Sequence, residues 1–67
     1  MTINEKIHII RNNKGMSQAE LAYKTGFSIY EIISYETNKT VISGYVLLSI
    51  LSALELNINE FKTYGYN

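Results

Sequence analysis

Apolar side chains recur along this sequence at helical spacing, in short stretches that polar or glycine-containing turns separate. The clearest positions are Ile3, Ile7 and Ile10 near the start, and Leu47, Ile50, Leu51 and Leu54 further on. Positions three and four residues apart share one face of a helix, so each stretch predicts a helix with one buried side. We expect five helices, over about residues 3–13, 18–25, 28–37, 43–54 and 58–64. No stretch alternates apolar and polar residues over the length of a strand, which favours an all-α fold.

Polar residues mark where these helices begin. A serine or threonine followed three residues later by glutamate forms a capping box, in which each side chain accepts a hydrogen bond from the other residue's backbone N–H. The sequence has such pairs at Thr2 and Glu5, Ser17 and Glu20, and Ser28 and Glu31, with Asn57 and Glu60 as a close variant. Residues suited to a left-handed helix end follow the first three helices, namely Gly15, Gly26 and Asn38. The helix starts and ends that these residues mark therefore agree with the helices that the apolar pattern predicts.

Composition limits the chemistry that the chain offers. Its 67 residues suit one domain over 1–67, and a hydrophobic content of 46% is typical of a globular fold. There is no cysteine, and the single histidine, His8, cannot build a zinc site, so we expect no metal and no cofactor. The sequence has no recognisable nucleophile–base pair or phosphate-binding loop, so we expect no enzymatic activity.

Charge and hydropathy narrow the choice of partner and location. Six basic residues balance six acidic ones, which excludes a nonspecific polycation for nucleic acid or membrane surfaces. The longest uncharged stretch, residues 40–54, is too short and too rich in Ser and Gly to span a bilayer. Glu5, Lys6 and Arg11 interrupt the apolar residues at the start, unlike a signal peptide. We therefore expect a cytoplasmic protein with no membrane partner.

Residues 18–37 have the layout of a helix-turn-helix. Ala22 leaves room for the close approach of a second helix, and Gly26 allows the left-handed backbone conformation that a tight turn requires. Ile32 and Tyr35, three residues apart, would hold the second helix on the core. In such motifs the second helix can enter the major groove of DNA, which makes residues 28–37 the candidate recognition helix.

On these residues the sequence resembles the Cro/Xre helix-turn-helix family of phage repressors and bacterial regulators. The matching segments are Ile10-Arg11, residues 14–22 (KGMSQAELA), residues 25–28 (TGFS), Ile32, Tyr35-Glu36, Asn38-Lys39, residues 47–54 and residues 56–61. The likeness extends over about residues 3–61. It implies a five-helix, lambda-repressor-like DNA-binding domain whose second and third helices form the helix-turn-helix. It also implies a transcriptional regulator, a repressor or controller, that binds palindromic double-stranded DNA as a homodimer.

The resemblance also implies roles for individual positions. Residues that would face base edges are Ser28, Ile29, Tyr30 and Ser34. Residues that would contact phosphates are Ser17, Gln18, Asn38, Lys39 and Thr40. Arg11 and Glu36 would form an internal ion pair between the first and third helices. Residues that would form a dimer interface are Leu48, Leu56, Ile58 and Phe61.

The candidate recognition helix lacks the side chains that most often read bases. No Arg, Gln or Asn lies between Ser28 and Glu36 to make paired hydrogen bonds with guanine or adenine. Ile29 and Tyr30 can pack on thymine methyl groups instead, which would favour A·T pairs. Two alternatives stay open: one places Ile29 and Ile33 in the core, and the other makes the fold a protein-interaction module with a protein partner. We expect residues 64–67 to be a short tail, mobile unless its tyrosines dock.

Overall fold

The computed structural model describes residues 1–65, which form five helices and no strand. In chain order the helices are α1 (Ile3–Asn13), α2 (Gln18–Thr25), α3 (Ile29–Glu36), α4 (Gly44–Ala53) and α5 (Ile58–Thr63). The all-α prediction is confirmed. Each observed boundary lies within one residue of its predicted position, because the signals that set helix ends are local in the sequence.

Each helix begins at a polar cap whose side chain accepts a backbone N–H from the first turn. Thr2, Ser28 and Asn57 form complete capping boxes with the glutamates three residues later. At Ser17 the box is only half made. The Ser17 hydroxyl accepts from the Glu20 N–H at 3.0 Å, but the Glu20 carboxylate does not return the bond, so the prediction of a full box is wrong there.

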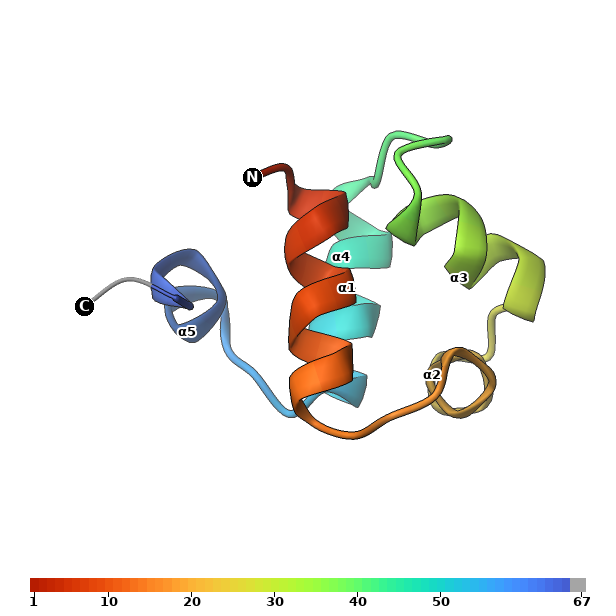
Figure 1. Ribbon diagram of the computed structural model, residues 1–67, viewed down its shortest axis with the longest axis horizontal. Coiled ribbons are helices and arrows are strands. Elements are labelled where there is room, and N and C mark those ends of the chain that lie inside the picture. The colour runs from red at the N-terminus through yellow and green to blue at the C-terminus, as the bar shows by residue number, and fades with distance from the viewer. Residues whose placement is uncertain (66–67) are drawn as a thin grey trace.

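The helices surround one apolar core. Helix α3 packs against α1 and α2, and α4 packs against α2 and α5. Figure 1 shows α1 in the middle, with α3 and α5 at opposite ends of the 33 Å long axis. The buried apolar side chains are Ile7, Ile10, Leu21, Ala22, Ile32, Tyr35, Ile50, Leu51, Leu54 and Phe61. Ile3 was expected on this buried face but is 47% exposed, because it lies in the first turn of α1 at the rim of the core, beside Ile58.

The turn between α2 and α3 is held by contacts that the sequence explains. Gly26 ends α2 in the left-handed conformation, with φ of 79°, and its N–H donates to the carbonyl of Ala22 at 2.9 Å. Phe27 then packs edge-on against the ring of Tyr35 in α3, with ring centroids 5.9 Å apart. Ser28 caps α3 immediately afterwards. The angle between the two helices is therefore fixed by backbone conformation, aromatic packing and a cap at once.

Candidate nucleic-acid interface

Helix α3 has one face in the core and one face on the surface. Ile32 is fully buried and Tyr35 is 9% exposed, so these two residues hold the helix down as predicted. Tyr30 is 78% exposed, and Ile29 and Ile33 are each 38% exposed. Ile29 and Ile33 are therefore not core residues of the monomer, and the outer face of α3 presents apolar and aromatic side chains to solvent.

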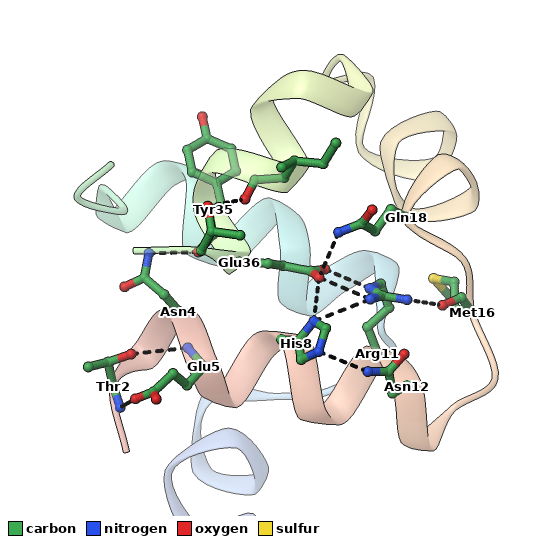
Figure 2. Close-up of polar contacts among 12 residues, drawn as sticks. Thr2, Asn4, Glu5, His8, Arg11, Asn12, Met16, Gln18, Tyr35 and Glu36 are labelled. Carbon is green, nitrogen blue, oxygen red and sulfur yellow. Dashed lines mark hydrogen bonds and ion pairs between the residues drawn. The ribbon is translucent and has the colours of Figure 1, made fainter. Parts of the chain in front are cut away.

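The C-terminal end of α3 is anchored by a buried carboxylate. The side chain of Glu36 is 1% exposed, and both of its oxygens face α1. Arg11 donates to it twice, from Nε to Oε2 at 2.6 Å and from Nη2 to Oε1 at 3.0 Å. Figure 2 shows His8 and Gln18 meeting the same carboxylate, at 2.7 Å and 3.2 Å from Oε1. The ion pair implied by the family resemblance is thus present, within a larger network that links three helices.

This network keeps Glu36 ionised. Burial alone would raise the pKa of the Glu36 carboxyl, because a charge is costly in a poorly solvated site. Hydrogen bonds from Arg11, His8 and Gln18 outweigh the burial and hold that pKa below its ordinary value. The guanidinium of Arg11 is satisfied too, since its Nη1 donates to the Met16 carbonyl at 2.6 Å, in the segment that leads into α2.

His8 and its partner Asn12 belong to this network, although we did not predict that role for either from the sequence. His8 is a surface histidine with a 47% exposed side chain, yet its Nδ1 lies 2.7 Å from Glu36 and its Nε2 lies 3.1 Å from the amide of Asn12. Both ring nitrogens of His8 are therefore engaged in the network, and Nδ1 also lies 3.3 Å from Nη2 of Arg11. The available signal was a polar stripe on α1, because Asn4, His8 and Arg11 follow helical spacing beside the apolar one.

The loop after α3 is tied to the start of α1. The Asn4 amide donates to the carbonyl of Tyr35 at 2.7 Å and to that of Thr40 at 3.1 Å. The Thr2 hydroxyl donates to the Asn38 side-chain oxygen at 3.0 Å. Asn38 takes the predicted positive φ, of 62°. The segment that carries the exposed Lys39 is therefore held in place beside the C-terminal end of α3.

The predicted phosphate-contacting residues fall into two groups around α3. Ser17 and Gln18 start α2, where exposed backbone N–H groups and the helix dipole favour an anion. The Gln18 side chain also reaches Glu36, so this group is connected to the end of α3. Asn38, Lys39 and Thr40 form the second group, in the loop that follows α3. No residue pairs with the Lys39 ammonium among the contacts described for residues 1–65.

The predicted dimer residues do not share one surface. Phe61 is 4% exposed and packs in the core of the monomer, so it has almost no surface to offer a partner. Leu48 is 61% exposed and borders a depression between α2 and α4. Ile58 is 44% exposed and lies beside Ile3 on the side formed by α1, α4 and α5. Leu56 is half-buried.

Other predictions concern the rest of the chain. Among residues 1–65 no cluster of His, Asp and Glu has the composition of a metal site. Over the same range no helix is long and apolar enough to cross a membrane. At the expected tail, Tyr64 is half-buried and its hydroxyl accepts from the Asn13 amide at 3.1 Å, while positions 66 and 67 lie outside the described residues.

Two short helices joined through Gly26, Phe27 and Ser28, with the second exposed along one face, define a helix-turn-helix protein. A family model described as Helix-turn-helix matches residues 7–61, from the first half of α1 into α5. The chain therefore belongs to the Cro/C1-type helix-turn-helix family, whose members are DNA-binding regulatory domains. No curated protein and no solved structure gives a significant match.

Proposed function

We propose that this protein is a sequence-specific transcriptional regulator of the cytoplasm, a repressor that binds a palindromic operator as a homodimer. The observation that carries the proposal is the exposed outer face of α3 on a helix whose position is fixed. The turn at Gly26 fixes one end and the network around Glu36 fixes the other. A rigid helix with a free face suits insertion into the major groove, where it would exclude other proteins from the site.

Base and phosphate contacts divide between α3 and its flanks in this proposal. Side chains that would meet base edges are Ser28, Ile29, Tyr30 and Ser34, of which Tyr30 is the most exposed. Phosphates would be held by Ser17 and Gln18 on one strand and by Asn38, Lys39 and Thr40 on the other. Phosphate contacts set position and affinity, whereas base contacts set sequence preference, so the two groups make different predictions.

Two substitutions separate those roles. Lys39→Ala should weaken binding by a similar factor on every DNA sequence and lower the salt dependence by about one phosphate contact. Tyr30→Ala should change the preferred base at one position. Lys62→Ala is the matched control, because Lys62 is an exposed lysine on α5, at the opposite end of the long axis from α3 (Figure 1).

The assay is a mobility shift on duplexes selected from a random-sequence pool, repeated at low and at moderate salt. Equal losses on all sequences for Tyr30→Ala would contradict its base-reading role. A folded protein that selects no sequence even at low salt would overturn the proposal. It would favour the second function, a protein-interaction module, which the apolar face of α3 and the zero net charge support.

Dimerisation has its own test, because the candidate interface residues lie on two sides of the molecule. We propose that an exposed apolar side chain of the C-terminal half, Leu48 or Ile58, lies at the centre of the dimer contact. Sedimentation equilibrium of Leu48→Asp and Ile58→Asp distinguishes the two sides, since a buried unpaired charge opposes association. One variant should become monomeric and the other should stay dimeric. A wild-type protein that is monomeric at assay concentrations, and also when bound to DNA, would refute the homodimer.

A further inference from the structure

The outer face of α3 carries two parallel rows of side chains. Ile29 and Ile33 are four residues apart and form one row, while Tyr30 and Ser34 form the next. Both isoleucines are 38% exposed, and Tyr30 is 78% exposed. A helix that offers two branched aliphatic side chains and one aromatic ring to solvent has an apolar contact surface, which is the reverse of the usual charged or amide-bearing surface of a base-reading helix.

The polar groups at both ends of α3 are already engaged with its backbone. The Glu31 carboxylate accepts from the Ser28 N–H at 2.8 Å, and the Ser28 oxygen accepts from the Glu31 N–H at 3.1 Å. The Thr37 hydroxyl donates to the Ile33 carbonyl at 2.8 Å. These local bonds leave the Ser28 hydroxyl proton, Ser34, the Tyr30 phenol and the second oxygen of Glu31 as hydrogen-bonding groups, and none of them can make the paired bonds that distinguish guanine or adenine.

We propose that this helix recognises the 5-methyl groups of pyrimidines in the major groove, with Ile29 and Ile33 as the specificity-determining residues. The inference rests on the proposed DNA-binding function and specifies how the sequence is read. Thymine differs from the other natural bases in carrying an apolar group on the major-groove edge. An aliphatic side chain contributes the most binding free energy where such an apolar group excludes water from it.

The spacing of the two isoleucines sets a register on the DNA. Residues four apart rise by about 6 Å along a helix axis, and successive bases on one strand rise by about 3.4 Å. A helix lying along the groove would therefore place Ile29 and Ile33 against methyl groups roughly two base steps apart. Each half of a palindromic operator should then contain two methyl-dependent positions with that separation.

Replacing thymine by uracil isolates the methyl group, because uracil keeps every hydrogen-bonding atom of thymine. The probe is a duplex selected from a random-sequence pool with the wild-type protein, then resynthesised with deoxyuridine at one thymine at a time. The contribution of one buried methyl corresponds to about a fourfold loss of affinity. We expect such losses at the two positions of each half-site and no change at the other thymines. A second probe replaces the same T·A pair by C·G or by 5-methylcytosine·G, and the methylated duplex should bind about fourfold more tightly than its unmethylated counterpart.

Protein variants assign each methyl to a residue. Ile29→Ser and Ile33→Ser remove every side-chain methyl group at these positions and leave a small polar side chain. In each variant the uracil effect should disappear at one position and persist at the other, which is the signature of a direct contact in a double-mutant cycle. Ile9→Ser is the matched control, because Ile9 is 37% exposed on α1 and takes the same substitution outside the proposed recognition helix. Circular dichroism of all three variants confirms that each is folded.

The outcomes separate this inference from the function on which it rests. Tight, selective binding that is unchanged by uracil at every thymine would overturn methyl recognition and leave the regulator intact. A uracil effect that persists fully in both Ile29→Ser and Ile33→Ser would also overturn it, because the methyl would then be read by another residue. Failure of the wild-type protein to select any DNA sequence would overturn the proposed function and this inference with it.

Discussion

Neutralising Glu36 should destabilise this protein more than any comparable change on its surface. The Glu36 carboxylate is the common acceptor for Arg11, His8 and Gln18, and its side chain is 1% exposed. Removing one member of a buried ion pair costs about 3–5 kcal/mol, because the remaining charge stays buried without compensation. We expect Glu36→Gln to fall at the lower end, about 3 kcal/mol, since the amide oxygen of glutamine still accepts one hydrogen bond.

That loss is large against the stability available to a chain of this size. At about 0.05–0.15 kcal/mol per residue, 67 residues give a free energy of unfolding of about 3–10 kcal/mol. A loss of about 3 kcal/mol lowers the melting temperature by about 12–24 °C in a small domain. A protein at the lower end of the stability range would be half unfolded at room temperature after this single change.

Thermal and urea unfolding followed by far-ultraviolet circular dichroism at neutral pH measure the effect. Glu20→Gln is the matched control, because Glu20 is an exposed glutamate on α2 and the same substitution there should change stability by no more than about 0.5 kcal/mol. The double variant Arg11→Met with Glu36→Leu should lose less than either Arg11→Met or Glu36→Gln alone, since no buried charge is left unpaired. If both single variants unfold within about 0.5 kcal/mol of the wild type, the ion pair does not stabilise the fold and the reasoning is refuted.

Three further predictions concern the pH dependence of stability, the glycine in the turn and the cap of α3. Because hydrogen bonds hold the pKa of Glu36 low in the folded state, the stability that its ionised form contributes is fully present above about pH 4.5 and is lost as the pH falls through the lower folded-state pKa. Glu36→Gln should therefore flatten the acid limb of a curve of stability against pH. Gly26→Ala should cost about 1 kcal/mol in urea unfolding, from backbone strain alone, because φ is +79° and nothing lies within 4 Å of the added Cβ. Ser28→Ala should lower the free energy of unfolding by about 1 kcal/mol, and Ser28→Asp, which restores a capping oxygen, should recover most of it; no recovery would contradict the capping explanation.

Local signals predicted the helices well. A cap, an apolar repeat and a glycine or asparagine at the end depend only on neighbours in sequence, so the starts and ends of α1 and α2 follow directly from residues 2–26. The half-made box at Ser17 is the exception, and a reciprocal bond requires a side-chain rotamer that sequence does not specify.

Contacts between helices were harder to predict. Arg11 and Glu36 are 25 residues apart, and only the family resemblance paired them. His8 was missed because a half-exposed histidine becomes a hydrogen-bond donor only when another helix brings a carboxylate to it. The dimer surface was predicted from apolar content alone, and that content does not distinguish Phe61, which is buried in the core of the monomer, from Ile58, which stays exposed. Leu47 and Leu48 show the same limit, since neighbours on a helix point about 100° apart.

The network around Glu36 helps to fix the orientation of α3, and so helps to keep its apolar outer face at the surface. Ile32 is buried and Ile33 is its neighbour, so rotating α3 by about 100° would exchange one isoleucine for the other in the core and bring Glu36 to the place of Tyr35. Exchanging the isoleucines alone would cost little, because apolar packing is not directional, but losing the contact of Tyr35 with Phe27 opposes the rotation. The bonds from Arg11 and Gln18 to Glu36 are directional, and the same rotation would break them all and leave the carboxylate buried without partners. The polar network of Glu36 and the packing of Tyr35 together therefore keep the aliphatic face of α3 outward.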